Sequence, residues 1–121
     1  MTEPLVPGNS DPNAHRVELE VPAAGTAVLT SSGRFDALVA AEVREVLADA
    51  RLDDCTHLVL DLEALAFLDS AGLAVLINAR RTMRARGGDV YLIMPREPEA
   101  LRVFSLTGFD QVFMMHAPRD E

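Results

Sequence analysis

Two polar residues, Asp69 and Ser70, follow an apolar run and begin a segment with helical spacing. The run at residues 58–62 predicts a buried strand, and residues 70–86 predict a helix. The first backbone N–H groups of a helix lack partners within it, and a Ser or Asp side chain can accept hydrogen bonds from them. This end of a helix also carries a partial positive charge and tolerates oxyanions. Ser70 therefore stands where its hydroxyl can be offered to another molecule.

A serine in such a place could also be a catalytic nucleophile. That chemistry needs a histidine base that is oriented by a third group. The Gly-x-Ser-x-Gly elbow of many hydrolases is missing, because position 68 is Leu. His15, His57 and His116 are scattered along the chain, and no His or Cys cluster has the spacing of metal ligands. We therefore expect no enzyme, no metal and no cofactor.

The composition narrows the classes of partner. The chain has 121 residues, enough for one domain, and a net charge of −8, which argues against binding nucleic acid. A single cysteine excludes an internal disulfide and favours a reducing compartment. The N-terminal residues do not have the basic and apolar layout of a signal peptide, and no apolar run approaches the ~18 residues of a membrane span. We expect a soluble, cytoplasmic protein that does not bind membranes.

The hydrophobic pattern predicts the element order β-β-α-β-α-β-α-β. Strands are expected at residues 16–21, 27–30, 57–62, 90–94 and 111–115, and helices at residues 37–51, 70–86 and 97–106, with a loop at residues 63–69. Because helices link the later strands, we expect an α/β domain with a mixed, mostly parallel sheet of about five strands and helices packed against it. Residues 1–14 are expected to be a flexible tail, residues 15–117 the domain, and residues 118–121 a C-terminal tail.

The helical spacing also predicts which residues face the sheet. The expected packing residues are Val39, Val43, Val46, Leu47 and Ala50 in the first helix, Gly72, Leu76, Ala79 and Met83 in the second, and Leu101, Phe104 and Ser105 in the third. Asp36 precedes the first helix and is expected to cap it.

Three stretches of the sequence match one family pattern in register: GRFD at residues 33–36, LVLDLEALAFLDSAGL at residues 58–73, and Gly87-Gly88 with the apolar strand and the LTGF sequence at residues 106–109 that follow. Together they resemble the STAS-domain anti-sigma factor antagonists of bacteria. The resemblance covers roughly residues 15–117 and implies the STAS fold. A lone Asp-Ser-x-Gly occurs often by chance, whereas the three stretches in register are specific.

The resemblance implies that Ser70 is phosphorylated by a partner, an anti-sigma factor that is also a serine kinase and that binds the ATP and magnesium. The unphosphorylated chain would bind this partner and so release a sigma factor. Phosphorylation would end the binding, and a serine phosphatase of the metal-dependent type would reset the switch. Asp69 and Gly72 match the family's motif, and Asp36 matches an acidic residue near the site. Ala71 departs from it, because a second Ser or Thr is frequent there.

The outer strip of the second helix is the candidate docking face. With the motif, the expected partner-binding residues are Asp36, Asp69, Ser70, Ala71, Gly72, Ala74, Ile77, Asn78 and Arg81. Two alternatives stay open: a STAS scaffold module of a transport or signalling complex in which Ser70 is never phosphorylated, and a purely structural role of Asp69 and Ser70 as helix caps.

Overall fold

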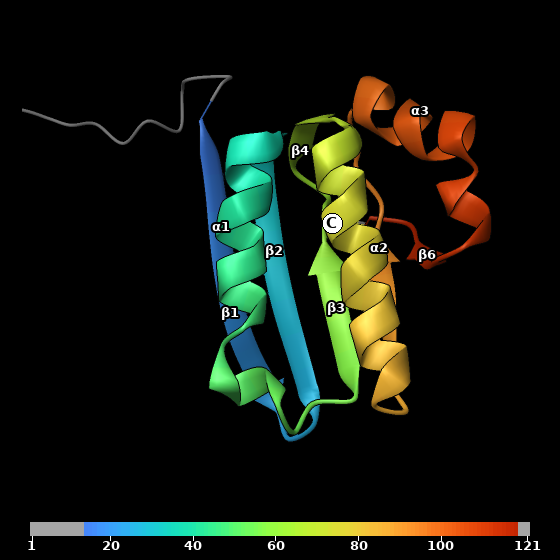
Figure 1. The fold of residues 1–121 in the computed structure, drawn as a ribbon. Helices are drawn as coiled ribbons and strands as arrows, with labels where there is room; N and C mark the ends of the chain where they lie inside the picture. The colour runs from blue at the N-terminus through green and yellow to red at the C-terminus, as the bar shows by residue number, and fades with distance from the viewer. Residues whose placement is uncertain (1–13, 119–121) are drawn as a thin grey trace, which may run out of the picture.

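Two helices lie side by side on one face of a twisted sheet, and a third helix sits near one end of it (Figure 1). The computed structural model describes residues 14–118. Its strands are β1 (His15–Ala23), β2 (Thr26–Phe35), β3 (His57–Asp61), β4 (Leu65–Leu68), β5 (Asp89–Ile93) and β6 (Met114–His116). Its α-helices are α1 (Ala37–Leu47), α2 (Ser70–Ala85) and α3 (Pro98–Thr107), with short 3-10 helices at Ala50–Leu52 and Phe109–Gln111.

The sheet has the strand order β1-β2-β3-β5-β6, and β4 also pairs with β2. β1 is antiparallel to β2, and every other pair is parallel. β3 pairs with the first half of β2, and β4 then pairs with its second half, so β4 continues beside β2 where β3 stops. The expected mixed, mostly parallel α/β architecture is confirmed, with six strands in place of about five.

The core lies between the sheet and the helices α1 and α2. Alternate residues of the central strands are fully buried on this side, for example Leu29, Leu60 and Leu92. Residues of the same strands that point to the other face, such as Val59 and Tyr91, are only half-buried. The second helix packs as expected, because Gly72, Leu76, Ala79 and Met83 are all buried.

The structure corrects the predicted loop at residues 63–69, because it contains β4. It also extends β2 to Phe35, well beyond the predicted residues 27–30. The β2–β4 register shifts between Gly33 and Arg34, and Gly33 has a positive φ of 77°. A Cβ at this position would collide with the carbonyl oxygen of Ala14. Glycine is needed at this irregularity.

Other boundaries and faces also differ from expectation. α1 ends at Leu47, before the predicted residue 51, because Asp49 is extended and caps the 3-10 helix that follows. The predicted last strand at residues 111–115 is shorter and later, Met114–His116, because a 3-10 helix occupies the preceding residues. Leu101 and Ser105 are exposed, whereas Ala100 and Phe104 make the buried side of α3. Ala50 is exposed as well.

The two predicted tails fall almost wholly outside the described residues, which leave out residues 1–13 and 119–121. Within residues 14–118, no helix combines the length and the apolar character that crossing a membrane requires.

Candidate functional site

The strand pair β2–β4 brings two aspartates to the same edge of the sheet. Phe35 and Leu68 are partners in the parallel register, and each is followed directly by an aspartate that caps a helix. The backbone N–H of Asp69 donates to the carbonyl oxygen of Phe35 at 3.3 Å. The N-termini of α1 and α2 therefore lie next to each other, with Asp36 near Asp69, as the family resemblance implied.

Asp36 caps α1. Its Oδ1 accepts a hydrogen bond from the backbone N–H of Val39 at 3.2 Å, and its Oδ2 accepts one from the guanidinium of Arg34. The Val39 N–H is the largest cause that lowers the pKa of Asp36 below 3.8, and Arg34 acts in the same direction while partial burial opposes it. Asp36 is thus a carboxylate at neutral pH and carries part of the negative charge of this surface.

Asp69 caps α2 and does so with a single oxygen. Its Oδ1 accepts from the backbone N–H groups of Ala71 at 3.0 Å and Gly72 at 3.1 Å. Ser70, the first residue of the helix, is exposed, and its hydroxyl makes no hydrogen bond within residues 14–118. Asp69 therefore caps the helix, and Ser70 does not, so the hydroxyl of Ser70 is left available to a partner.

Gly72 lets α2 approach the ends of both strands. A Cβ on Gly72 would lie 2.6 Å from Cδ1 of Leu68 and 2.9 Å from Cδ1 of Phe35. Gly72 is itself buried, and Ala71 is half-buried against the core. Both were predicted to bind a partner, yet they lie against the fold and offer little surface to another protein.

Two large apolar side chains flank the capped helix ends, and the sequence analysis missed both. Leu38, in the first turn of α1, is 70% exposed, and Phe67, three residues before Ser70, is 49% exposed. Exposed leucine and phenylalanine side chains near the two helix N-termini favour contact with another protein. The sequence shows that both residues are apolar, but whether an apolar side chain is exposed depends on the tertiary packing.

The predicted docking strip on α2 is largely exposed. Ala74, Asn78 and Arg81 are exposed, and Arg81 Nη1 donates to Asn78 Oδ1 at 3.4 Å. Ile77 is half-buried and packs against the core, so it contributes less surface than expected. Contact of this strip with a partner stays a prediction.

The described residues contain no group of three or more His, Cys, Asp or Glu side chains that could hold a metal ion. The chemistry available at this edge of the sheet is that of an accessible hydroxyl at a helix N-terminus, with the capping aspartates of two adjacent helices close by. Such a group can accept a phosphoryl group or be enclosed by another protein.

Comparison with known proteins gives the family of this chain. The STAS domain model matches residues 18–121. The anti-sigma-F factor antagonist RsfB of Mycobacterium tuberculosis is 34% identical over 92 residues, which are 75% of this chain and 73% of RsfB. The anti-sigma-B factor antagonist of Listeria monocytogenes is 28% identical over 81 residues, covering 67% of this chain and 70% of that protein.

Solved structures agree with the sequence relatives. An anti-sigma factor antagonist from Mycobacterium paratuberculosis superimposes with a TM-score of 0.73 at 28% identity and covers 87% of each chain. The antagonist SpoIIAA in its unphosphorylated form has the same fold, with a TM-score of 0.74 at 24% identity over 87% of this chain and 90% of SpoIIAA. On the match over residues 18–121 and the shared architecture, this chain belongs to the STAS domain family.

Proposed function

We propose that this protein is an anti-sigma factor antagonist that binds an anti-sigma factor while Ser70 is unmodified and releases it when Ser70 is phosphorylated. The observation that carries the proposal is the division of roles at the start of α2. Asp69 satisfies the helix N–H groups, and the neighbouring hydroxyl of Ser70 is exposed and without a partner in residues 14–118. The names of the relatives, RsfB among them, support an anti-sigma factor as the binding partner.

Phosphorylation would act on binding through charge and shape. A phosphoryl group adds about −1.5 to −2 charges and three acceptor oxygens. It would stand beside Asp69, near Asp36, on a chain whose net charge is already −8. An interface closed around a small hydroxyl then loses fit and gains repulsion. If this costs about 3 kcal/mol, affinity falls about a hundredfold, since ~1.4 kcal/mol corresponds to a factor of ten.

In this proposal the chain is a binding protein and a phosphoryl acceptor, and the partner is the enzyme. The anti-sigma factor would act as a serine kinase and supply ATP, magnesium and the catalytic base. A serine phosphatase would restore the hydroxyl. Because sigma factors act on transcription, the switch belongs in the cytoplasm.

The docking face would combine the capped helix ends with the outer strip of α2. Leu38 and Phe67 supply apolar surface, and Arg81 supplies a positive charge in the C-terminal half of α2. Arg81→Glu should weaken partner binding several-fold without a change in the melting temperature, because the side chain is exposed and hydrogen-bonds only to Asn78 within the described residues. Unchanged affinity in calorimetric titration would remove Arg81 from the interface.

The deciding experiment is intact-mass spectrometry of the protein after incubation with ATP, magnesium and candidate kinase-type anti-sigma factors from the same genome. Ser70→Ala is the test variant, and Ser105→Ala is the matched control, because Ser105 is an exposed serine on α3. We expect one phosphate on the wild type and the control and none on Ser70→Ala, with partner capture by the unmodified form alone.

Two results would contradict this proposal in different ways. Partner binding without phosphorylation by any kinase would favour a phosphorylation-independent scaffold. The absence of both phosphate and partner would refute the antagonist function.

A further inference from the structure

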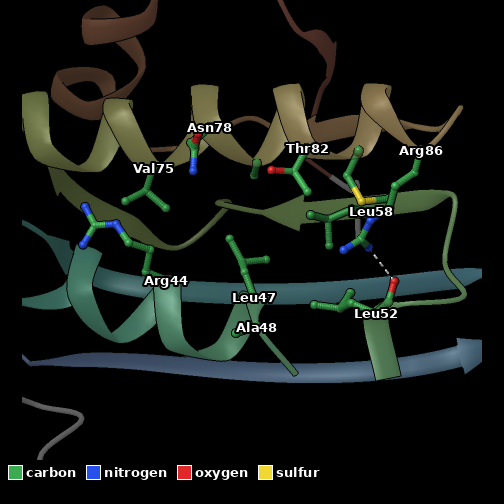
Figure 2. A pocket seen from close by; sticks show the side chains of 11 residues that line it. Arg44, Leu47, Ala48, Leu52, Leu58, Val75, Asn78, Thr82 and Arg86 are labelled. Carbon is green, nitrogen blue, oxygen red and sulfur yellow. Dashed lines mark hydrogen bonds between the residues drawn. The ribbon is translucent and has the colours of Figure 1, made fainter. Parts of the chain in front are cut away.

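A cleft opens between α1 and α2, along the half of α2 that is remote from Ser70 (Figure 2). Its volume is about 180 Å³. Val75, the α2 lining residue nearest to Ser70 in sequence, is five positions from it, or about 7.5 Å along a helix, and Asn78 belongs both to the cleft and to the outer strip of α2. Ser70 itself does not line the cleft.

The floor of this cleft is apolar. Leu52, Leu58, Val75, Ala79 and Met83 line it, and each is at least nine-tenths buried within the fold. These side chains come from α2, from β3 and from the 3-10 helix at Ala50–Leu52, so a bound molecule would contact the hydrophobic core of the domain. Burial of apolar ligand surface against such a floor is the main source of affinity in small-molecule sites.

Two arginines border the cleft, Arg44 from α1 and Arg86 just after the last turn of α2, and Figure 2 places them at opposite ends. Arg86 Nη1 donates to the carbonyl oxygen of Leu52 at 2.9 Å, which holds the guanidinium against the cleft. Neither arginine pairs with a carboxylate in the part of the chain that the structure describes. Although the protein has a net charge of −8, two such cations beside one apolar cleft attract an anion to this part of the surface.

We propose that this cleft binds a small organic carboxylate with an apolar body. A cavity of about 150 Å³ with apolar walls is large enough for benzene, so a cleft of 180 Å³ accommodates a short alkyl chain or a single ring. The carboxylate would take charge-assisted hydrogen bonds from one guanidinium, whose planar fork matches its two oxygens. The apolar body would lie on the floor formed by Leu58, Val75 and Met83.

Residues of both α1 and α2 line the cleft. A ligand that binds the folded state and contacts both helices raises the melting temperature with its concentration. The binding does not need Ser70, so the inference stands or falls apart from the antagonist function.

The test uses hexanoate as the probe, titrated into the full chain and followed by two-dimensional amide NMR. We expect saturable shifts confined to the residues that line the cleft, Leu52 and Leu58 included. Hexan-1-ol and hexylamine, which keep the chain but lack the negative charge, should bind at least tenfold more weakly. One of the two variants Arg44→Gln and Arg86→Gln should weaken hexanoate binding about tenfold, the loss expected for one charge-assisted hydrogen bond, and the other should weaken it less, because its guanidinium acts only at a distance.

Arg102→Gln is the matched control, because Arg102 is an exposed arginine on α3 that is also without a carboxylate partner within residues 14–118. It should leave hexanoate affinity unchanged. Arg44 makes no hydrogen bond within the described residues, so its variant keeps the fold and tests the charge alone. Equal affinity for hexan-1-ol, shifts spread outside the cleft, an equal loss in the control, or no saturation would each overturn the proposal.

Discussion

Replacement of Asp69 gives the sharpest test of how the start of α2 is built. Its Oδ1 holds two backbone N–H groups, those of Ala71 and Gly72, which have no acceptor inside the helix. Asp69→Ala removes both bonds. Asp69→Asn retains an oxygen that can accept them, because asparagine is as good an N-cap as aspartate. The pair of variants therefore separates the hydrogen bonds from the charge.

The expected loss for Asp69→Ala is about 1 kcal/mol, within the range of 0.5–2 kcal/mol for removal of an N-cap. In a domain of this size, 1 kcal/mol lowers the melting temperature by roughly 3–6 °C. Asp69→Asn should lose only a fraction of that amount. Ser70→Ala should leave the melting temperature nearly unchanged, because its hydroxyl makes no hydrogen bond within residues 14–118.

The assay is thermal unfolding by circular dichroism, with urea unfolding as an independent measure of the free energy. The three variants are compared with the wild type in the same buffer. A loss for Ser70→Ala as large as that for Asp69→Ala would show that Ser70 is the cap after all. Equal losses for Asp69→Ala and Asp69→Asn would show that charge, and not the cap, stabilises this end of α2.

Three further predictions concern the strands and surfaces around this site. Gly33→Ala should destabilise the fold by more than about 2 kcal/mol in urea unfolding, because it adds a backbone collision to the cost of a positive φ. Gly25→Ala should lose only about 1 kcal/mol, because Gly25 has a positive φ of 84° but open space around it. The lowered pKa of Asp36 stabilises the fold above about pH 4, and this contribution is lost as the pH falls through the lower pKa of the folded state. Asp36→Asn should therefore lose less stability than the wild type when the pH is lowered from about 5 to about 2.5. An equal loss in the two proteins would contradict this linkage. Phe67→Ala should weaken partner binding at an unchanged melting temperature, while Met114→Ala, with a similar exposure of 47% against 49%, should not; equal affinities for the two variants would exclude Phe67 from the interface.

The sequence predicts most of the fold because its signals are local. The helix that begins at Ser70 follows from a capping aspartate, an apolar face and two terminal glycines. β4 was missed because its four residues, LAFL, lack the alternation of a half-buried strand and depend on pairing with the end of β2. That pairing requires an irregular register at Gly33, which no local pattern reveals.

The candidate site could likewise be predicted only in part from the sequence. Asp36, Asp69 and Ser70 could be found because each lies beside a predicted helix start. The exposure of Leu38 and Phe67 could not, because an apolar residue in either stretch is compatible with the core until the strands are paired. The cleft between α1 and α2 was also beyond the sequence, since its lining residues come from segments up to 42 positions apart, Arg44 to Arg86.

The hydrogen bond from Asp69 to Phe35 has a consequence for the speed of the proposed response. It ties the start of α2 to the end of β2, so the hydroxyl and the two carboxylates are already in place before any partner arrives. A surface built on paired strands and capped helices needs no folding step on association, and little entropy is lost in ordering it. The delay between a signal and the release of a sigma factor would then be governed by enzymatic turnover on Ser70 and by partner dissociation. The timing of such a circuit can be tuned in the kinase and phosphatase while this chain stays the same.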